Sequence, residues 1–345
     1  MQYGFSAAQL VALSVFCSYF SIIAGLLVVI WRSLPLRAQS VDSRAYVFVA
    51  LALASFAHTW FYMFGFMAWS FADYERAKNL PEGLLERLSR WLLDTSLFEQ
   101  AWASVCFGEV NWWWSQQLCL FTVGTWTIFM ATEGPRHQIK LVWAYMLLGQ
   151  LVAISVASNL FYLALVLAGP PPRASSPWAP PALWIPVLLS LGAVARSPFT
   201  DEYTFLPNLL AMHLLIVVPL VVPTWGTPRF SLRLSTLYVL VFIAALAMHT
   251  RATSNALGEP AVSARQFVRN AWQVLHSHPA QASIGWDVIW TTVSFVAWIL
   301  LRDGAAPPLL TAAYLTLATP LASVGVLAPH ILRSRDDEPE KSKSH

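Results

Sequence analysis

Long, unbroken stretches of apolar side chains are the feature that most limits what this chain can fold into. The hydrocarbon core of a bilayer, about 30 Å thick, is crossed by roughly 20 residues of helix, and nine runs approach that length. They lie at approximately 7–31, 45–71, 112–132, 141–168, 182–196, 207–225, 234–250, 284–301 and 308–331. Because these runs are continuous rather than alternating, they indicate membrane helices and not the strands of a barrel.

The composition agrees with this interpretation. Of the 345 residues, 57% are hydrophobic and 11% are charged, and the formal net charge is only +3. These proportions exclude a soluble enzyme, a disordered chain and a nucleic-acid binder. We predict an all-α, polytopic helical bundle of about nine transmembrane helices, or eight if the short run 182–196 does not cross. Residues 1–332 would form this single domain and 333–345 a cytosolic polar tail.

The charges between the runs predict the orientation of the chain. Lys and Arg are more frequent in the connections that are cytosolic if the N-terminus is lumenal and the C-terminus cytosolic. The last five residues, from Lys341 to His345, look like the dilysine signal that retrieves proteins to the endoplasmic reticulum. The expected location is therefore the membrane of that compartment. The first run is too long for a cleaved signal, so we expect it to remain as a helix.

Two connections carry amphipathic patterns. Segments 84–94 and 261–275 each place apolar residues on one helical face and charged residues on the other, which is typical of helices at the lipid surface. Residues 169–182 are rich in proline and predict an irregular loop. Cys17, Cys106 and Cys119 have no short spacing, so neither a disulfide framework nor a thiolate metal site is expected.

Ionisable residues near the membrane are the best candidates for function, because a charge in lipid is unfavourable unless it is paired or hydrated. Asp287 begins the eighth run, Asp201 and Glu202 precede Pro207 at the start of the sixth, and Glu133 follows the third. In the predicted topology all of them lie on the cytosolic side and could converge. Two close carboxyls cannot both stay ionised, so one would remain protonated as an acid. The alternative is that Asp287 is simply a carboxylate stabilised at a helix N-terminus.

Other polar and aromatic residues complete the candidate site. Glu99 and Glu109 lie beside aromatic residues on the opposite side and define a rival pocket. His58 lies well inside the second run, where a lone histidine is more often an interhelical hydrogen-bond donor than a functional group. The candidate lining residues are Trp126, Trp286, Trp290, His58 and Asn159.

Several well-known catalytic motifs are missing from the chain. There is no aspartate-rich diphosphate motif within a helix, no histidine box, no zinc spacing, no glycine-rich phosphate loop and no nucleophile elbow. We therefore expect metal-free, proton-driven chemistry with no cofactor, on a lipophilic small molecule that arrives from the bilayer. Neither a nucleic-acid partner nor an obligate protein partner is indicated.

Five segments resemble a group of fungal integral-membrane proteins. The chain is similar to the membrane-bound terpene cyclases of the ascofuranone, ascochlorin and macrophorin meroterpenoid pathways over most of its apolar region, although none of the segments is a catalytic signature. The segments are Thr125–Phe129, Thr132–Gly134, Trp143–Gln150, Thr204–Leu210 and Gly285–Trp290.

The resemblance implies a role in fungal secondary metabolism. The reaction would be cyclisation of the farnesyl or epoxyfarnesyl chain of a prenylated aromatic substrate, started by a proton and without loss of diphosphate. Our hypothesis for the acid is Asp287, with Glu202 or Asp201 as its hydrogen-bonded partner and Glu133 as a further candidate. Tryptophan rings would stabilise the carbocation. The main alternative is a multi-pass transporter of a small lipophilic molecule, and a non-catalytic scaffold is a third possibility.

Overall fold

The structure is a computed structural model that describes residues 5–35, 42–78, 83–172, 176–222, 229–258, 263–302 and 309–336. Nearly all of these residues are helical, so the predicted all-α class is confirmed. The first half contains α1 (Ala7–Ser33), α2 (Ser43–Ala77), α3 (Leu84–Thr95), α4 (Leu97–Cys106), α5 (Glu109–Leu120), a π-helical segment η1 (Phe121–Trp126), α6 (Thr127–Arg136), α7 (Val142–Leu151) and α8 (Ile154–Ala168). The second half contains β1 (Trp178–Ala179), α9 (Pro181–Arg196), a 3-10 turn η2 (Ser197–Phe199), α10 (Phe205–Leu215), α11 (Val218–Val221), β2 (Leu232–Arg233), α12 (Leu234–Leu257), α13 (Ala264–Leu275), α14 (Pro279–Leu301), α15 (Leu309–Ala322) and α16 (Val324–Asp336).

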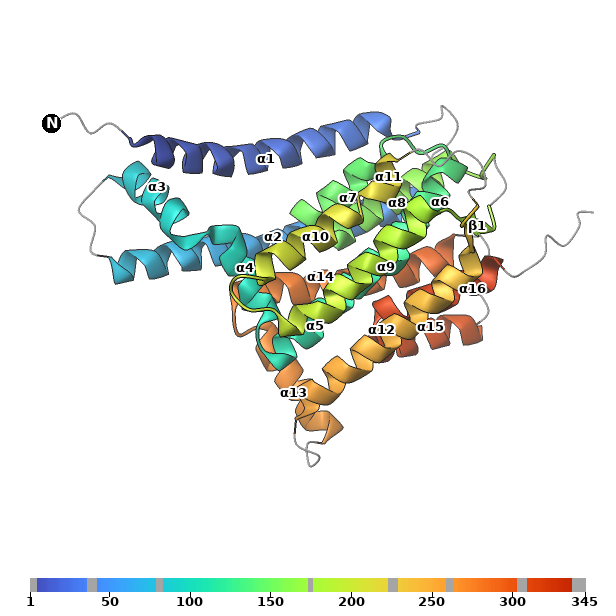
Figure 1. Ribbon diagram of the computed structural model, residues 1–345. Helices are drawn as coiled ribbons and strands as arrows, with labels where there is room; N and C mark the ends of the chain where they lie inside the picture. Colours follow the sequence, from blue (N-terminus) through green and yellow to red (C-terminus); the bar gives the residue numbers. More distant parts are fainter. Residues whose placement is uncertain are drawn as a thin grey trace, which may run out of the picture.

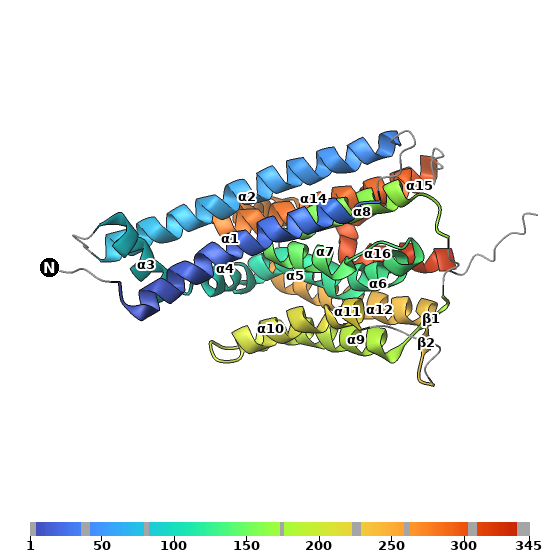
Figure 2. The ribbon, with the colours of Figure 1, turned by 90° about the horizontal axis from the view of Figure 1, so that it is seen from above.

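Most of the helices run along one axis of an elongated bundle, with α1 and α2 against one side (Figures 1 and 2). In the described part of the chain, five helices are long and apolar enough to cross a membrane: Ala7–Ser33, Ser43–Ala77, Pro181–Phe199, Leu234–Leu257 and Pro279–Leu301. The third of these contains the short run whose crossing the sequence left open. The chain therefore has the character of a multi-pass helical membrane protein.

The predicted run 112–132 lies inside one uninterrupted helical path. This path comprises α5, η1 and α6, and its middle widens into a π-helical segment where the hydroxyl of Thr127 donates to the carbonyl of Thr122 at 2.7 Å. A Cβ on Gly124 would lie 2.6 Å from Val241 of α12, so the missing side chain allows α12 to approach closely. Such π-helical insertions frequently occur at functional sites.

The run 141–168 is not one spanning helix, which corrects the sequence prediction. The chain leaves helical geometry at Val152 and Ala153, and α8 folds back along α7, so that a Cβ on Gly149 would lie 3.2 Å from that of Ala157. At the other end of the hairpin, Nδ1 of His137 lies 3.1 Å from the carbonyl oxygen of Gly169. Residues 137–169 therefore enter the bundle and leave it at the same end, with the turn in its middle.

The run 308–331 is likewise two helices and not one. α15 and α16 meet at Ser323, whose φ is +73°, and both lie in the same half of the bundle (Figure 2). α16 continues to Asp336, so the first residues of the predicted polar tail 333–345 are helical. Lys341 and Lys343 lie outside the described residues. The run 207–225 corresponds to α10 and α11, with residues 223–225 outside the described part.

Stacked and edge-on aromatic rings form the centre of the core. Trp126 packs edge-on against Phe161 and Tyr162 at centroid separations of 5.5 and 5.7 Å, and Tyr162 stacks on Trp298 at 5.0 Å. Each of these rings is at most 7% exposed. The layer joins α8 and α14 to the π-helical segment, and it keeps their relative register.

The two amphipathic connections form helices as predicted. The segment 84–94 becomes α3, and Trp91 on its apolar face donates to the hydroxyl of Ser70 at 3.0 Å. The segment 261–275 becomes α13, which begins with a capping box between Ser263 and Gln266. The proline-rich loop contains one short strand, β1, which pairs antiparallel with β2.

Candidate functional site

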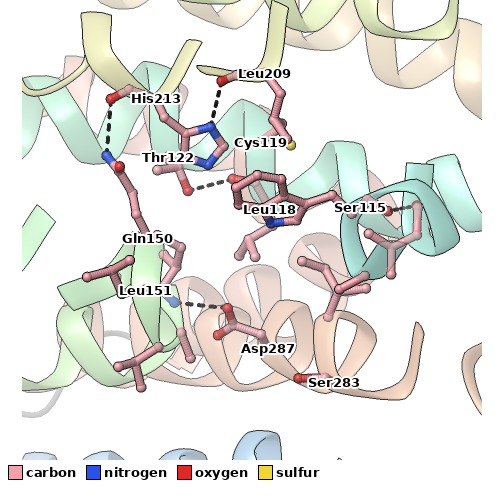
Figure 3. A pocket seen from close by; sticks show the side chains of 18 of the residues that line it. Ser115, Leu118, Cys119, Thr122, Gln150, Leu151, Leu209, His213, Ser283 and Asp287 are labelled. Carbon is pink, nitrogen blue, oxygen red and sulfur yellow. Dashed lines mark hydrogen bonds between the residues drawn. The ribbon is translucent and has the colours of Figure 1, made fainter. Parts of the chain in front are cut away.

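A cavity of about 360 Å³ lies at the inner turn of the α7–α8 hairpin. Its walls come from α1, α2, α4, α5, α10 and α14, and most of the lining is aliphatic or aromatic (Figure 3). Ligand pockets of about 300–1,000 Å³ commonly hold small molecules. Among the lining residues that the structure describes, Asp287 is the only carboxylic acid.

Asp287 occupies the wall where the hairpin reverses. Its Oδ1 accepts the backbone N–H of Ser155 at 2.8 Å, and its Oδ2 accepts that of Ile154 at 2.9 Å. The first N–H groups of a helix have no partner within the helix, and a carboxylate complements them both by hydrogen bonding and through the helix dipole. Asp287 is 5% exposed. The predicted alternative was that Asp287 lies at the N-terminus of its own helix, but it is the ninth residue of α14. It caps the N-terminus of another helix, α8.

Two further contacts hold the turn from other sides. The hydroxyl of Tyr19 on α1 donates to the carbonyl of Leu151 at 2.6 Å, and the amide of Gln150 donates to the carbonyl of His213 on α10 at 3.3 Å. Neither contact was anticipated from sequence. Together with Asp287, they connect the hairpin turn to three separate helices, so the geometry of the cavity depends on all of them.

His213 lies on the wall opposite Asp287 (Figure 3). Its Nδ1 is 2.7 Å from the carbonyl oxygen of Leu209. A carbonyl only accepts, so in the neutral ring Nδ1 carries the hydrogen and Nε2 keeps its lone pair. The ring also stacks on Trp102 of α4 with 5.8 Å between centroids. The cavity thus has a carboxyl on one wall and an imidazole with a free acceptor nitrogen on the other.

Asp201 and Glu202 do not reach this cavity. Both are exposed in the loop between η2 and α10. Asp201 accepts from the side chain and the backbone N–H of Thr204, at 2.8 and 2.9 Å, and these hydrogen bonds hold the pKa of its carboxyl below the usual range. Asp201 is therefore an ionised turn residue and not the predicted partner of Asp287.

Glu133 is at the other end of the bundle. It forms an ion pair with Arg136 at 3.1 Å and lies 3.2 Å from Nε2 of His137. The loop that holds Asp201 and Glu202 lies at the end where α1 begins, whereas α6 ends at the opposite one (Figures 1 and 2). The predicted convergence of four carboxyls is wrong. The physical reason is the α7–α8 hairpin, which returns the chain to the side it came from and reverses the sidedness of the following loop.

The three tryptophans proposed to line the site lie elsewhere. Trp126 belongs to the aromatic core layer and borders a separate, very small pocket. Trp286 and Trp290 surround His58 on an outer face of the α2–α14 pair: the ring centroids of His58 and Trp286 are 4.3 Å apart, and Nε1 of Trp290 donates to Nδ1 of His58 at 3.2 Å. His58 therefore makes an interhelical hydrogen bond, but as its acceptor. The aromatic rings of the cavity are instead Tyr19, Phe98 and Trp102.

The rival acids lie on the other side of α4. Glu99 lines a second cavity of about 320 Å³ between α1, α3 and α4. Phe98 and Trp102 border both cavities and separate them. Glu109 is exposed in the first turn of α5. Asn159, the remaining candidate, is fully buried in α8 and lines neither cavity.

No metal site forms in the described ranges, where no three His, Cys, Asp or Glu side chains gather as metal ligands would.

The cavity residues that the sequence candidates did not include are Tyr19, Trp102, Gln150 and His213. A signal existed for His213, which follows Pro207 in an apolar helix. Gln150 is equally unusual as a polar residue within an apolar run.

Comparison with known proteins leaves the family open. The chain matches no protein-family model, and no curated protein or solved structure is significantly similar to it. The resemblance to fungal terpene cyclases therefore stays a prediction, and we infer the function from the residues that line the cavity.

Proposed function

We propose that this protein is a membrane enzyme that cyclises the polyene chain of a lipophilic substrate by protonating it. The observation that carries the proposal is the single carboxyl, Asp287, in the wall of a cavity that is otherwise lined mostly by apolar side chains. A mostly apolar lining disfavours bulk water beside the substrate, and a carbocation intermediate needs this protection from water. The proposed substrate class, from the resemblance, is a prenylated phenol with a farnesyl or epoxyfarnesyl chain.

Asp287 would be the proton donor. Each carboxyl oxygen has two lone pairs, so Oδ2 can accept the N–H of Ile154 and still carry a proton. The proton passes to the epoxide oxygen, the carbon–oxygen bond breaks, and the electrons of the neighbouring double bond form the new carbon–carbon bond. The α8 N–H groups then stabilise the carboxylate that remains.

Aromatic faces would stabilise the positive charge that migrates along the chain. Tyr19, Phe98 and Trp102 line the cavity and offer π-faces without a nucleophile. A desolvated cation–π contact contributes up to about 2 kcal/mol. Cys106 and Cys119 also line the cavity, where they add soft apolar surface.

His213 would end the reaction. Its Nε2 lone pair can remove a proton from the carbon beside the cation, which leaves a carbon–carbon double bond and a protonated imidazole. The proton returns to Asp287 before the next cycle, so substrate and product have the same mass. This assignment depends on the Leu209 contact, which keeps Nε2 as the acceptor.

The setting that fits this chemistry is the endoplasmic reticulum of a fungus, with the N-terminus lumenal and the C-terminus cytosolic. Five candidate membrane helices among the described residues and the mostly apolar lining of the cavity support uptake of a lipophilic substrate from lipid. Biosynthesis of a meroterpenoid, a secondary metabolite, would place the protein after a prenylation step. No cofactor is needed for this reaction.

The direct test is incubation of membranes that contain the protein with a farnesylated phenol epoxide, followed by mass spectrometry. We expect a cyclic isomer of unchanged mass from the wild type and from Asp201→Asn, and none from Asp287→Asn. Full activity of Asp287→Asn would eliminate it as the acid. Loss of product in Glu99→Gln alone would move the site to the second cavity, and no product from the wild type would contradict the proposal.

The second candidate is a transporter of a small lipophilic molecule. One observation favours it: short helices that break in the middle of a bundle, as α7 and α8 do, are common at transport sites. Transport predicts uptake of the unchanged phenol into proteoliposomes. Cyclisation predicts chemical conversion without a concentration gradient, so the two are separable in one experiment.

A further inference from the structure

Helices α8 and α14 lie side by side in the same direction, and two contacts establish their register. At one end Ser155 donates its backbone N–H to Asp287 at 2.8 Å. At the other end Tyr162 stacks on Trp298 with 5.0 Å between centroids and 5° between planes. The residues between these two points on the facing sides of the helices must therefore meet each other.

Those intervening residues are polar. Helical spacing places Asn159 on the same face as Ser155 and Tyr162. On α14 the same reasoning aligns Thr291 and Ser294 with Asp287 and Trp298. Asn159, Thr291 and Ser294 are each 0% exposed. We call Ser158, Asn159, Thr291 and Ser294 the polar stripe. It begins behind Asp287 and leads away from the cavity.

Most polar atoms of the stripe have no partner in the described residues. Five buried atoms make no hydrogen bond there. Four belong to the stripe (Ser158 Oγ, Asn159 Nδ2, Asn159 Oδ1 and Ser294 Oγ), and the fifth is Trp298 Nε1 at its far end. A buried polar group without a partner is unfavourable because it has lost its hydrogen bonds to water, so five such atoms along one pair of helices would strongly destabilise the fold. Native proteins meet such demands with internal water, and one buried water typically makes about three hydrogen bonds.

We propose that the polar stripe binds a short chain of internal water between Asn159 and Ser294. About three water molecules, at roughly three hydrogen bonds each, would satisfy the five atoms and still bond to one another. Thr291 connects this water to the site, because its hydroxyl lies 3.5 Å from Oδ1 of Asp287. The existence of the water requires no particular reaction. Its role rests on the proposed function: the water hydrates the Asp287 carboxyl from the side that faces away from the substrate.

The far end of the stripe is closed. Phe48 and Phe129 pack on Tyr162 and Trp298 with centroid separations from 5.6 to 6.1 Å, and all four rings are buried. Water in the stripe is therefore separated from the outer end of the bundle and communicates with Asp287 alone. In the proposed reaction the Asp287 carboxyl lies between this water and the cavity that holds the substrate.

The test needs no substrate. A structure of the wild-type protein at a resolution that shows ordered water should contain density within hydrogen-bond distance of both Asn159 and Ser294. Asn159→Leu should remove that density and shift the infrared carboxyl band of Asp287, identified by its loss in Asp287→Asn. Asn208→Leu, which changes an asparagine that donates to α9, should do neither. Ser294→Ala is a second, smaller change in case Asn159→Leu does not fold.

Two results would overturn the inference. One is a dry stripe in a structure that shows water elsewhere in the bundle. The other is a carboxyl band unchanged in both Asn159→Leu and Ser294→Ala. Failure of the proposed cyclisation leaves both measurements intact, because they concern the resting protein. If the water is present but cyclase activity is absent, the proposed function fails and the water site stands.

Discussion

The carboxyl group of Asp287 accepts the backbone N–H of Ser155, 132 positions earlier in the chain, at 2.8 Å. A side chain of α14 therefore supplies the N-cap that α8 lacks locally, since its own N-cap residue, Ala153, has no side-chain acceptor. This contact does two things at once. It stabilises the hairpin turn in the middle of the bundle, and it brings the one carboxyl of the cavity to its wall.

The cap predicts different effects for two changes at this position. Asp287→Ala leaves two buried N–H groups without an acceptor, and we expect the free energy of unfolding to fall by about 1.5–3 kcal/mol. Asp287→Asn keeps one acceptor oxygen and should lose less. Thermal unfolding in detergent measures both. Equal stability of wild type and Asp287→Ala would mean that the cap is unimportant.

Close packing inside the hairpin predicts that Gly149 tolerates no larger side chain. A Cβ there would lie 2.9 Å from Ile154 Cδ1 and 3.2 Å from Ala157 Cβ. We expect Gly149→Val to destabilise the protein by about 1–3 kcal/mol through overpacking. Gly192→Ala is the matched control, because it has no atom within 4 Å of the new Cβ. A stable Gly149→Val variant would argue against the hairpin.

The hairpin also predicts the sidedness of two loops. Gln138 and Glu202 should lie on opposite sides of the membrane, whereas a single helix over 141–168 would put them on the same side. The test uses Gln138→Cys and Glu202→Cys in a variant without the three native cysteines. A membrane-impermeant maleimide in sealed vesicles should label one of them only. Labelling of both from the outside would support the single helix.

The end of α2 and the helix α3 should respond to pH through Lys78 and Asp94. The hydrogen bond with the Lys78 ammonium holds the pKa of the Asp94 carboxyl below its usual range. A lowered pKa in the folded state means that stabilisation is present at neutral pH and is lost as the pH falls through the folded value. The protection factors of the α3 amides, which are exchange rates corrected for the intrinsic effect of pH, should therefore fall in acid. Asp94→Asn should remove this dependence, and an unchanged acid response would show that another group is responsible.

His213 predicts the chemistry of the product. If it removes the final proton, His213→Phe should still allow protonation and ring closure, but the cation in this water-poor cavity would then lose a proton at another carbon or be captured by a hydroxyl of the substrate. Chromatography with mass spectrometry should show a changed set of cyclic isomers of the same mass. His249→Phe is the control, since His249 forms a side-chain hydrogen bond with Gln116 and does not line the cavity. An unchanged product from His213→Phe would exclude it as the base.

Much of the architecture follows from local sequence. Apolar runs such as 7–31 and 284–301 form helices because a chain in lipid must satisfy its backbone groups internally. The amphipathic patterns of α3 and α13 and the capping box at Ser263 are equally local, and the structure contains all three. Asp287 could be selected from its sequence alone, because a carboxyl within an apolar helix needs a partner.

Only the tertiary structure decided where helices break and which residues meet. The turn at Val152 and Ala153 contains neither Gly nor Pro, and nothing nearby favours it; the broken backbone is stabilised by Asp287, Tyr19 and His213 from distant segments. Counting apolar residues cannot reveal such a turn, since a hairpin and a spanning helix bury the same side chains. That one reversal separates Glu133 from Asp201 and leaves Asp287 alone at the cavity.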